Sequence, residues 1–524
     1  MVYEYLSSNS IGKVTIMRTA IFVYQKYFLF LFFFLLLIPG ILGLLHAGFF
    51  LSDDGNWMVI RFSAFYEALR HGQFPVRFLP RLLNGYGYPV ADFLYPLFMY
   101  IGVPIHILGA NFITTIKILF GVSFILSGIF SYVWLKILFK KMPAVLGALV
   151  YTYFPYHLFD LYKRGSIGEM VALAIVPFVL WQIEKKHTAW VGLGIALLIL
   201  AHNTLALLFL PVLITYYLLR EPQKLHCIYA CLFGLGIAAF FWIPALYDAQ
   251  YTVFDTKPVS SIAGYFINSS TYYLLGFISA AGIVGGIVAI VRKNLLSTYF
   301  FIVCILSLFL SLSISEFMWN LLPLGRYVQF PFRFLSLSAL SIGFLIAYML
   351  SILEKKWKKA GIGVICMLLF FSVIKVLFPS EYQYYPESWY STNQDSTTVQ
   401  NEYLPRGVKQ IPTNKISTIQ LLSGQGVLSQ IFSNGNKITL TAFMHGAGML
   451  QVNTVYFPGW NINVDSEKTQ VRITNNGLIL VKLSKGTHKV VVYFTETPVR
   501  LMADIISSIS VIALGWYFLK TGKK

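Results

Sequence analysis

The chain has 524 residues, of which 57% are hydrophobic and only 12% are charged. Soluble proteins carry about 25% charged residues, so the composition excludes an ordinary soluble protein. The net charge of +19 suits a nucleic-acid partner, but Lys and Arg stand in short clusters between apolar runs. Clusters of this kind mark the cytoplasmic ends of membrane spans, so we expect a bilayer protein and no nucleic acid.

Apolar runs of about 20 residues, the length that crosses a bilayer as a helix, recur along the chain. With clusters such as Lys140-Lys141 and Arg292-Lys293 placed in the cytoplasm, they predict a polytopic α-helical membrane protein of about twelve spans. The predicted spans are 27–50, 114–138, 142–158, 169–184, 188–202, 204–220, 225–247, 271–291, 297–315, 331–353, 360–378 and 498–519. Both termini, including a cytoplasmic segment 1–26, then lie inside the cell.

The first predicted outer loop, 52–113, contains two short helical patterns. The segment "WMVIRFSAFYEALRHG" (57–72) predicts an interfacial helix, with its aromatic residues toward lipid and with Arg61, Glu67 and Arg70 toward water. The segment 95–109 is apolar but short and contains Pro104, so we expect it to lie in the interface or to re-enter the outer leaflet.

Residues 380–497 follow a different pattern, in which apolar and polar residues alternate, as in "KITLTAF" and "HKVVVYF". Turn sequences such as "SNGN" and "NNG" separate these runs, so we expect an extracytoplasmic antiparallel β-sandwich. The predicted order is the cytoplasmic segment, a transmembrane domain over 27–379, the β-domain, and a last span with a basic tail over 498–524. In "VYFPGW", the aromatic residues either stack on sugar rings or fill the β-domain core.

Ionisable and polar residues gather on the predicted outer side, where desolvation makes them costly and therefore functional candidates. They are Asp53, Asp54, Arg77, Arg81, Asp92, Arg164, Glu169, His202, Asn203, Arg326 and Arg333.

Each of these residues also has a structural interpretation. Asp53 and Asp54 suit a helix N-cap, and Arg77 and Arg81 suit snorkelling at the interface. The remaining alternatives are that Asp92 pairs with one of those arginines, that Glu169 caps a helix or pairs with Arg164, that His202-Asn203 forms a polar turn, and that Arg326 and Arg333 anchor the interface.

A mixture of acids and arginines at one membrane face suits sugar transfer from a polyprenyl-phosphate donor. One carboxylate takes the proton of the acceptor hydroxyl, and the arginines bind the phosphate that leaves. A phosphate leaves as a stable anion, so the reaction needs no general acid, unlike glycoside hydrolysis, where a pair of acids is usual.

Seven sequence stretches, spread in order along nearly the whole chain, carry a family resemblance. They are "DDGNW…R" (53–61), "GQFPVRFLPRLLNGYGYPVADFLYPL" (72–97), "KRGSIGEMVALAIVPFVLW" (163–181), "LLILAHNTLAL" (197–207), "QFPFRFLSLSAL" (329–340), "NEYLPRG" (401–407) and the run from "VYFPGWNINVD" (455) to "TETP" (498). The layout resembles the GT-C superfamily of membrane glycosyltransferases. More narrowly, it resembles the YfhO-like, 6-pyruvoyl-tetrahydropterin synthase-related bacterial membrane proteins. No residue supports the pterin chemistry that this family name suggests.

The resemblance implies an inverting transferase in the plasma membrane, with a polyprenyl-phosphate sugar as donor and an extracytoplasmic glycan, teichoic acid or lipid as acceptor. It assigns the catalytic acids to Asp54, with Asp53 next, and to Glu169, and it places substrate contacts at the other outer residues. No cofactor is certain, and the sequence leaves open whether these three acids hold Mg²⁺ or Mn²⁺. The alternatives are a transporter or flippase for lipid-linked glycans and a non-catalytic envelope assembly protein.

Overall fold

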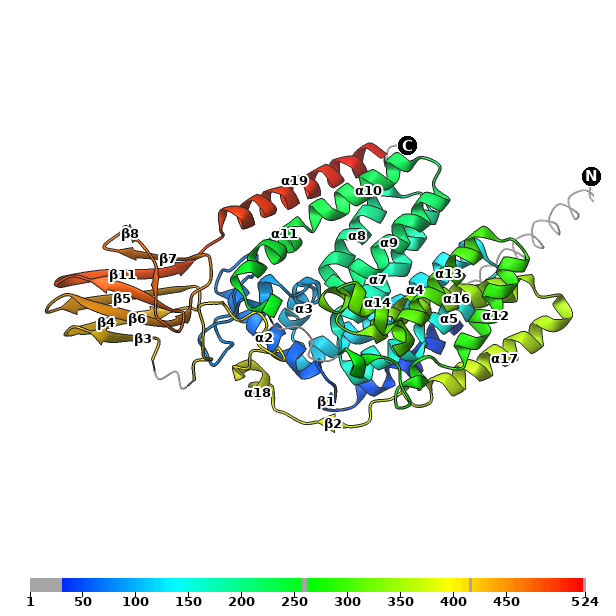
Figure 1. The fold of residues 1–524 in the computed structure, drawn as a ribbon, viewed down its shortest axis with the longest axis horizontal. Helices are drawn as coiled ribbons and strands as arrows, with labels where there is room; N and C mark the ends of the chain where they lie inside the picture. The colour runs from blue at the N-terminus through cyan, green and yellow to red at the C-terminus, as the bar shows by residue number, and fades with distance from the viewer. Residues whose placement is uncertain (1–30, 257–261, 414–416, 522–524) are drawn as a thin grey trace, which may run out of the picture.

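The computed structural model describes residues 31–256, 262–413 and 417–521. The predicted cytoplasmic segment 1–26 and the start of the first predicted span lie outside the described residues. In the described part, a helical body occupies most of the molecule, and β-sheets form one end of its long axis (Figure 1). A single helix, α19 (Pro498–Thr521), leads from the sheets back along the helical body.

The other helices follow the predicted order closely, and most of their ends fall at the polar residues and turns that separate the apolar runs. Their bounds are α2 (Gly55–Arg70), α3 (Leu97–Ile107), α4 (Phe112–Leu138), α5 (Lys141–Thr152), α6 (Pro155–Phe159), α7 (Ile167–Glu184), α8 (Thr188–Ala201), α9 (Asn203–Arg220), α10 (Lys224–Ile237), α11 (Ala239–Asp248), α12 (Ile278–Val291), α13 (Leu295–Ser311), α14 (Glu316–Leu321), α15 (Leu324–Tyr327), α16 (Leu335–Ile352), α17 (Lys355–Val373) and α18 (Glu387–Thr392).

Five helices within the described ranges are long and apolar enough to cross a membrane, or six if α10 and α11, bent by 65°, form one span. The prediction of about twelve spans exceeds this number because several apolar runs form shorter helices. The run predicted over 271–291, for example, becomes α-helical only from Ile278, and the helix Leu31–Leu45 is a 3-10 helix from Ile38 onward. The chain is thus a helical multi-pass membrane protein, and the larger count stays a prediction.

Helices α5 and α16 approach closely where two glycines face each other. A Cβ on Gly147 of α5 would lie 2.6 Å from the carbonyl oxygen of Gly343 in α16, and a Cβ on Gly343 would lie 2.8 Å from that of Gly147. Because lipid supplies no hydrophobic drive between helices, such small-residue contacts hold them through van der Waals packing.

Helix α2 is largely packed inside the protein, so the predicted exposure of Arg61 to water and of its aromatic residues to lipid is wrong, whereas Arg70 is exposed and Glu67 is 43% exposed, as predicted. Phe62 and Phe65 are fully buried, and so is Arg61, which donates to the Thr397 carbonyl at 2.6 Å. The covering segment follows α17: Ser63 donates to the carbonyl of Tyr390 in α18 at 2.8 Å. Periodicity alone could not show that residues more than 300 positions away would replace both lipid and water on this helix.

The β-domain consists of two antiparallel sheets, with strand orders β3-β6-β10-β9 and β4-β5-β11-β7-β8. Their buried residues alternate with outward-facing ones, as the sequence predicts. The strands are β3 (Ile419–Ser423), β4 (Gly426–Ser433), β5 (Lys437–Met444), β6 (Gly448–Val455), β7 (Trp460–Val464), β8 (Glu467–Thr469), β9 (Arg472–Ile473), β10 (Leu478–Leu483) and β11 (Gly486–Phe494). Phe457 and Trp460 are buried, so these aromatic residues of "VYFPGW" fill the core.

The first part of the predicted β-domain packs on the helical body. Its strand β2 (Tyr382–Gln383) pairs antiparallel with β1 (Phe49–Phe50), immediately before the two aspartates of the outer loop. The two-sheet fold starts only at Ile419, because the preceding residues cover α2. This pairing fixes the backbone that leads to Asp53.

We predict that Gly147→Val lowers the free energy of unfolding by about 1–3 kcal/mol, because its side chain meets the backbone of α16. Gly363→Val is the matched control, since a Cβ at that α17 position meets no atom within 4 Å. Thermal unfolding of both variants in detergent measures the difference. Equal destabilisation would contradict a close α5–α16 contact.

Candidate functional site

Four short segments converge at one end of the helical body, mostly at helix beginnings. Glu169 lies in the first turn of α7, and His202 lies between α8 and α9. Arg164 ends the π-helical turn η3 (Asp160–Arg164), and Arg333 lies in η9 (Pro331–Phe334), before α16. Four outer residues chosen from the sequence thus come together.

Glu169 is the centre of this cluster and is fully buried. Its carboxylate accepts hydrogen bonds from Arg164, from the Nε of Arg333 at 2.9 Å and from the hydroxyl of Tyr156 at 2.8 Å. The positive end of the α7 dipole adds to this stabilisation. A buried charge needs such partners, so Glu169 serves here to hold two guanidinium groups in place.

His202 faces the same carboxylate in its neutral form. Its Nδ1 accepts from the backbone N–H of Leu205 at 3.2 Å and so caps α9. The proton must then lie on Nε2, which is 3.6 Å from the Glu169 carboxylate. Burial lowers the pKa of His202 to about 3, although the charge of Glu169 opposes this. His202 is therefore a capping residue and a neutral donor toward Glu169.

The two aspartates meet this cluster through the backbone. The N–H groups of Asp53 and Asp54 donate to the carbonyls of Lys163 and Arg164 at 2.9 and 2.8 Å. Asp54 occupies the N-cap position of α2, but its side chain makes no capping hydrogen bond. Its carboxylate instead lies 3.8 Å from the Arg164 guanidinium and keeps 29% of its side chain exposed.

Asp53 is placed differently from its neighbour. Its side chain is 53% exposed and pairs with Lys163 at 3.2 Å, on the outside of the loop. Desolvation raises the pKa of Asp54, and Asp53 adds to this, whereas Arg164, Arg61 and Arg333 oppose it. The structure thus separates the two acids: Asp54 is the acid among the arginines that still reaches the surface.

Two glycines allow this close approach of the loops. Gly165 has a φ of +64°, and a Cβ there would lie 2.8 Å from the backbone nitrogen of Gly55. A Cβ on Gly55 would in turn lie 2.4 Å from the Oγ of Ser52. Larger residues at either position would push Asp54 away from Arg164.

Sequence reasoning missed three members of the site. Asp160 accepts from Arg164 at 3.2 Å, and its spacing four residues before that arginine was the available signal. Burial and the charge of Glu169 raise the pKa of Asp160 well above its usual value. Tyr156 had no such signal in the sequence. Arg61 was expected to face water, but it lies on α2 two turns after Asp54, and this spacing puts both residues on one face of the helix.

Arg77 and Asp92 lie in a second, separate ion network. Arg77 contacts Asp92 at 3.5 Å and Asp504 of α19 at 2.9 Å. Arg500, also in α19, contacts Asp248 at 2.8 Å and Asp92 at 3.6 Å. All but Asp504 are fully buried, so the alternative interpretation that Arg77 snorkels is wrong, and the alternative that Asp92 pairs with an arginine is confirmed. This network joins the outer loop to α11 and α19.

The remaining predicted contacts lie apart from Glu169. Arg81 pairs with Glu67 at 2.9 Å and donates to carbonyls of α18 and Asn393, so it also does not snorkel. Asn203 is exposed and donates to the Phe93 carbonyl at 3.2 Å. Arg326 is exposed on α15.

The donor set does not fit a divalent cation. Both oxygens of Glu169 already accept from arginine or tyrosine donors, and Asp53 faces outward to Lys163. Mg²⁺ and Mn²⁺ require several free oxygen ligands, which leaves only Asp54 of the three predicted acids. Among the described residues, no group of three His, Cys, Asp or Glu side chains is placed to hold a metal.

The fold and the site together define a helical membrane protein with a buried arginine–carboxylate centre. The chain belongs to the family described as "6-pyruvoyl-tetrahydropterin synthase related domain; membrane protein", whose model matches residues 92–382, more than half of the chain. A second family model, "Bacterial membrane protein YfhO", matches residues 413–506, which include the β-sheets and the start of α19. The resemblance stated from the sequence is thereby confirmed.

An uncharacterized protein of Lactococcus lactis subsp. cremoris (strain MG1363) is 23% identical over 257 residues, which are 45% of this chain and 41% of that protein. The match thus spans less than half of this relative. The oligosaccharyltransferase of Archaeoglobus fulgidus is similar in structure in its apo form, with 13% identity, a TM-score of 0.40, and coverage of 69% of this chain and 57% of that chain. The same enzyme tethered to an acceptor peptide containing the NVT sequon gives 12% identity, a TM-score of 0.40, and coverage of 73% and 61%.

We predict that Glu169→Gln lowers the free energy of unfolding by about 3–5 kcal/mol, because it removes the buried carboxylate that Arg164 and Arg333 share. Glu67→Gln is the matched control: its side chain is 43% exposed, and Arg81 keeps its carbonyl acceptors, so the cost is at most about 1 kcal/mol. Thermal unfolding in detergent compares the two. A tolerated Glu169→Gln would refute a central role for this carboxylate.

Proposed function

We propose that the protein is an inverting membrane glycosyltransferase that moves a sugar from a polyprenyl-phosphate donor to an extracytoplasmic acceptor. The observation that carries this proposal is the position of Asp54. Its carboxylate reaches the surface, makes no capping bond, and lies beside Arg164, which Glu169 holds. One accessible acid next to fixed arginines suits a reaction with a hydroxyl nucleophile and a phosphate leaving group.

In the proposed reaction, Asp54 accepts the proton of the acceptor hydroxyl as the hydroxyl oxygen attacks the anomeric carbon. The bond from that carbon to the phosphate oxygen breaks, and its electron pair leaves with the polyprenyl phosphate. Arg164 binds the phosphate charge that develops. A single displacement inverts the anomeric configuration, and no second acid is needed, since the phosphate leaves as an anion.

Glu169 and Arg333 are positioning residues in this proposal. Glu169 is fully buried and engaged by its donors, so it is not the base. The guanidinium of Arg164 also lies over the rings of Phe330 and Phe332, 5.5 and 5.2 Å from their centroids, and Arg333 lies 4.8 Å from that of Phe330. These contacts fix the guanidinium groups before substrate binds, which electrostatic stabilisation requires.

We also propose that the chain lies in the plasma membrane with about twelve spans, cytoplasmic termini and an extracytoplasmic β-domain. The support is the distribution of charge. Basic clusters such as Lys140-Lys141 and Arg292-Lys293 lie at the ends of helices, at positions in the chain that are remote from the residues of the Glu169 cluster. The positive-inside rule then puts the Glu169 cluster and the sheets on the outer side.

We predict that Asp54→Asn lowers sugar transfer by at least about 100-fold, because an amide cannot accept the hydroxyl proton. Asp53→Asn makes the same change at the exposed neighbour and retains transfer. The assay follows labelled sugar from undecaprenyl-phosphate sugars into envelope acceptors, with purified protein in nanodiscs.

Three results would oppose this proposal in different ways. Loss of transfer in Asp53→Asn alone would move the base to Asp53. Full activity in both variants would remove the aspartates from the chemistry. Movement of the intact lipid-linked sugar without cleavage would favour a flippase.

The pH dependence of transfer gives an independent test. The carboxylate of Asp54 must be ionised to act as base, so transfer rises with pH through its raised pKa. Arg61→Gln removes a charge that lowers this pKa, so the acidic limb moves to higher pH, whereas Asp53→Asn removes a charge that raises it and moves the limb to lower pH. Rate profiles of both variants measure these opposite shifts. Shifts of the same sign would exclude Asp54 as the titrating base.

A further inference from the structure

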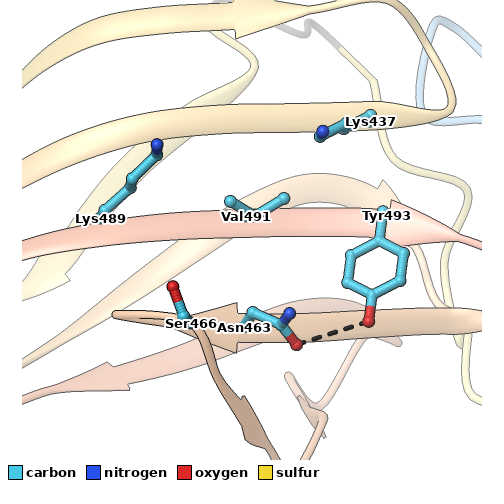
Figure 2. A pocket seen from close by; sticks show the side chains of 6 residues that line it. All are labelled: Lys437, Asn463, Ser466, Lys489, Val491 and Tyr493. Atoms are coloured by element: carbon cyan, nitrogen blue, oxygen red, sulfur yellow. Dashed lines mark hydrogen bonds between the residues drawn. The ribbon is translucent and has the colours of Figure 1, made fainter.

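The outward face of the five-stranded sheet carries a group of polar side chains that the catalytic site does not use. A shallow pocket of about 380 Å³ lies there, between Lys437 of β5, Lys489 and Tyr493 of β11, and Asn463 of β7. Figure 2 shows these side chains standing over the strands, with the Tyr493 hydroxyl 3.4 Å from the Asn463 side-chain oxygen.

The register of the strands explains why these residues share one face. Tyr493 lies opposite Lys437, and Val491 lies opposite Asn463. Lys489 is four residues from Tyr493 on the same strand, which places the two lysine positions about 13 Å apart along the sheet. The intervening residues point inward and are buried, so the face is set by the strand alternation itself.

This face combines positive charge with hydrogen-bonding groups. The outward positions of β5, β11 and β7 are Lys437, Thr439, Thr441, Phe443, Thr487, Lys489, Val491, Tyr493, Asn461 and Asn463, which include two cations and no acid. The nearest acid along the pocket, Asp465, already accepts from His488 at 2.7 Å and from the Lys489 backbone at 2.8 Å. A ligand here meets lysines, hydroxyls and amides.

We propose that this face binds an anionic glycan, a sugar polymer that carries carboxylate or phosphate groups. The lysines match its charges, and the threonine and asparagine side chains match its hydroxyls. An anionic lipid surface shares the charge but fits the placement less well, because the sheets lie beyond the helices along the long axis of the molecule (Figure 1). The further step, that this glycan is the sugar acceptor, rests on the proposed glycosyltransferase function.

The test measures binding by the full chain in nanodiscs of neutral phosphatidylcholine. The probes are fluorescent polygalacturonate oligomers for carboxylates, phosphomannan for phosphates, and unphosphorylated mannan as the neutral glycan. We expect at least one anionic probe to bind, neutral mannan to bind at least tenfold more weakly, and added salt to weaken the anionic binding. In Lys437→Gln/Lys489→Gln, Kd rises at least about tenfold.

The matched control removes the same amount of charge from the other sheet. Arg472 and Lys482 are exposed on the strands β9 and β10, and Arg472→Gln/Lys482→Gln leaves Kd unchanged. Equal losses in both double variants, equal binding of neutral mannan, or no binding of either anionic probe would overturn the proposal. Lysine-dependent flotation with phosphatidylglycerol vesicles, without glycan binding, would replace it by a membrane contact.

Binding and catalysis are separable in this design. Binding that depends on Lys437 and Lys489, with no transfer by the wild type, would refute the glycosyltransferase proposal alone. Transfer without lysine-dependent binding would refute only the glycan face.

Discussion

The buried carboxylate of Glu169 is the interaction on which the rest of the site depends. It compensates two guanidinium groups that come from segments almost 170 residues apart. Without it, the ends of η3 and η9 would bring like charges together in an apolar environment, which costs several kcal/mol. Because Arg164 is fixed in this way, its other terminal nitrogen faces Asp54 at 3.8 Å.

A second buried network has a different purpose. Arg77 and Arg500 share Asp92, and through it they connect the outer loop to α19, the helix that follows the sheets. Arg500 also donates to the Pro458 carbonyl at 2.8 Å, at the base of the β-domain. These contacts hold the sheets against the helical body, so the arginines predicted to bind substrate are divided between the Glu169 cluster and this structural network.

The sequence supplied the candidate residues, but it could not show which of them lie together in one site. Ionisable residues are costly in so apolar a chain, and this argument selected eleven residues, of which the structure brings Asp54, Arg164, Glu169, His202 and Arg333 together. The same argument selected Arg77 and Asp92, which satisfy each other elsewhere. Each buried charge needs a partner, but the sequence does not show which residue is that partner.

The sequence by itself determined the membrane setting, most helix positions and the alternating strands. These follow from local periodicity and composition, which act over a few residues. Only the tertiary structure decided which acid lies beside the arginines: Asp53 and Asp54 are adjacent in the chain, yet Asp53 faces Lys163 in solvent and Asp54 faces Arg164. It likewise buried Arg61 under a segment 336 residues away, because burial depends on what covers a residue.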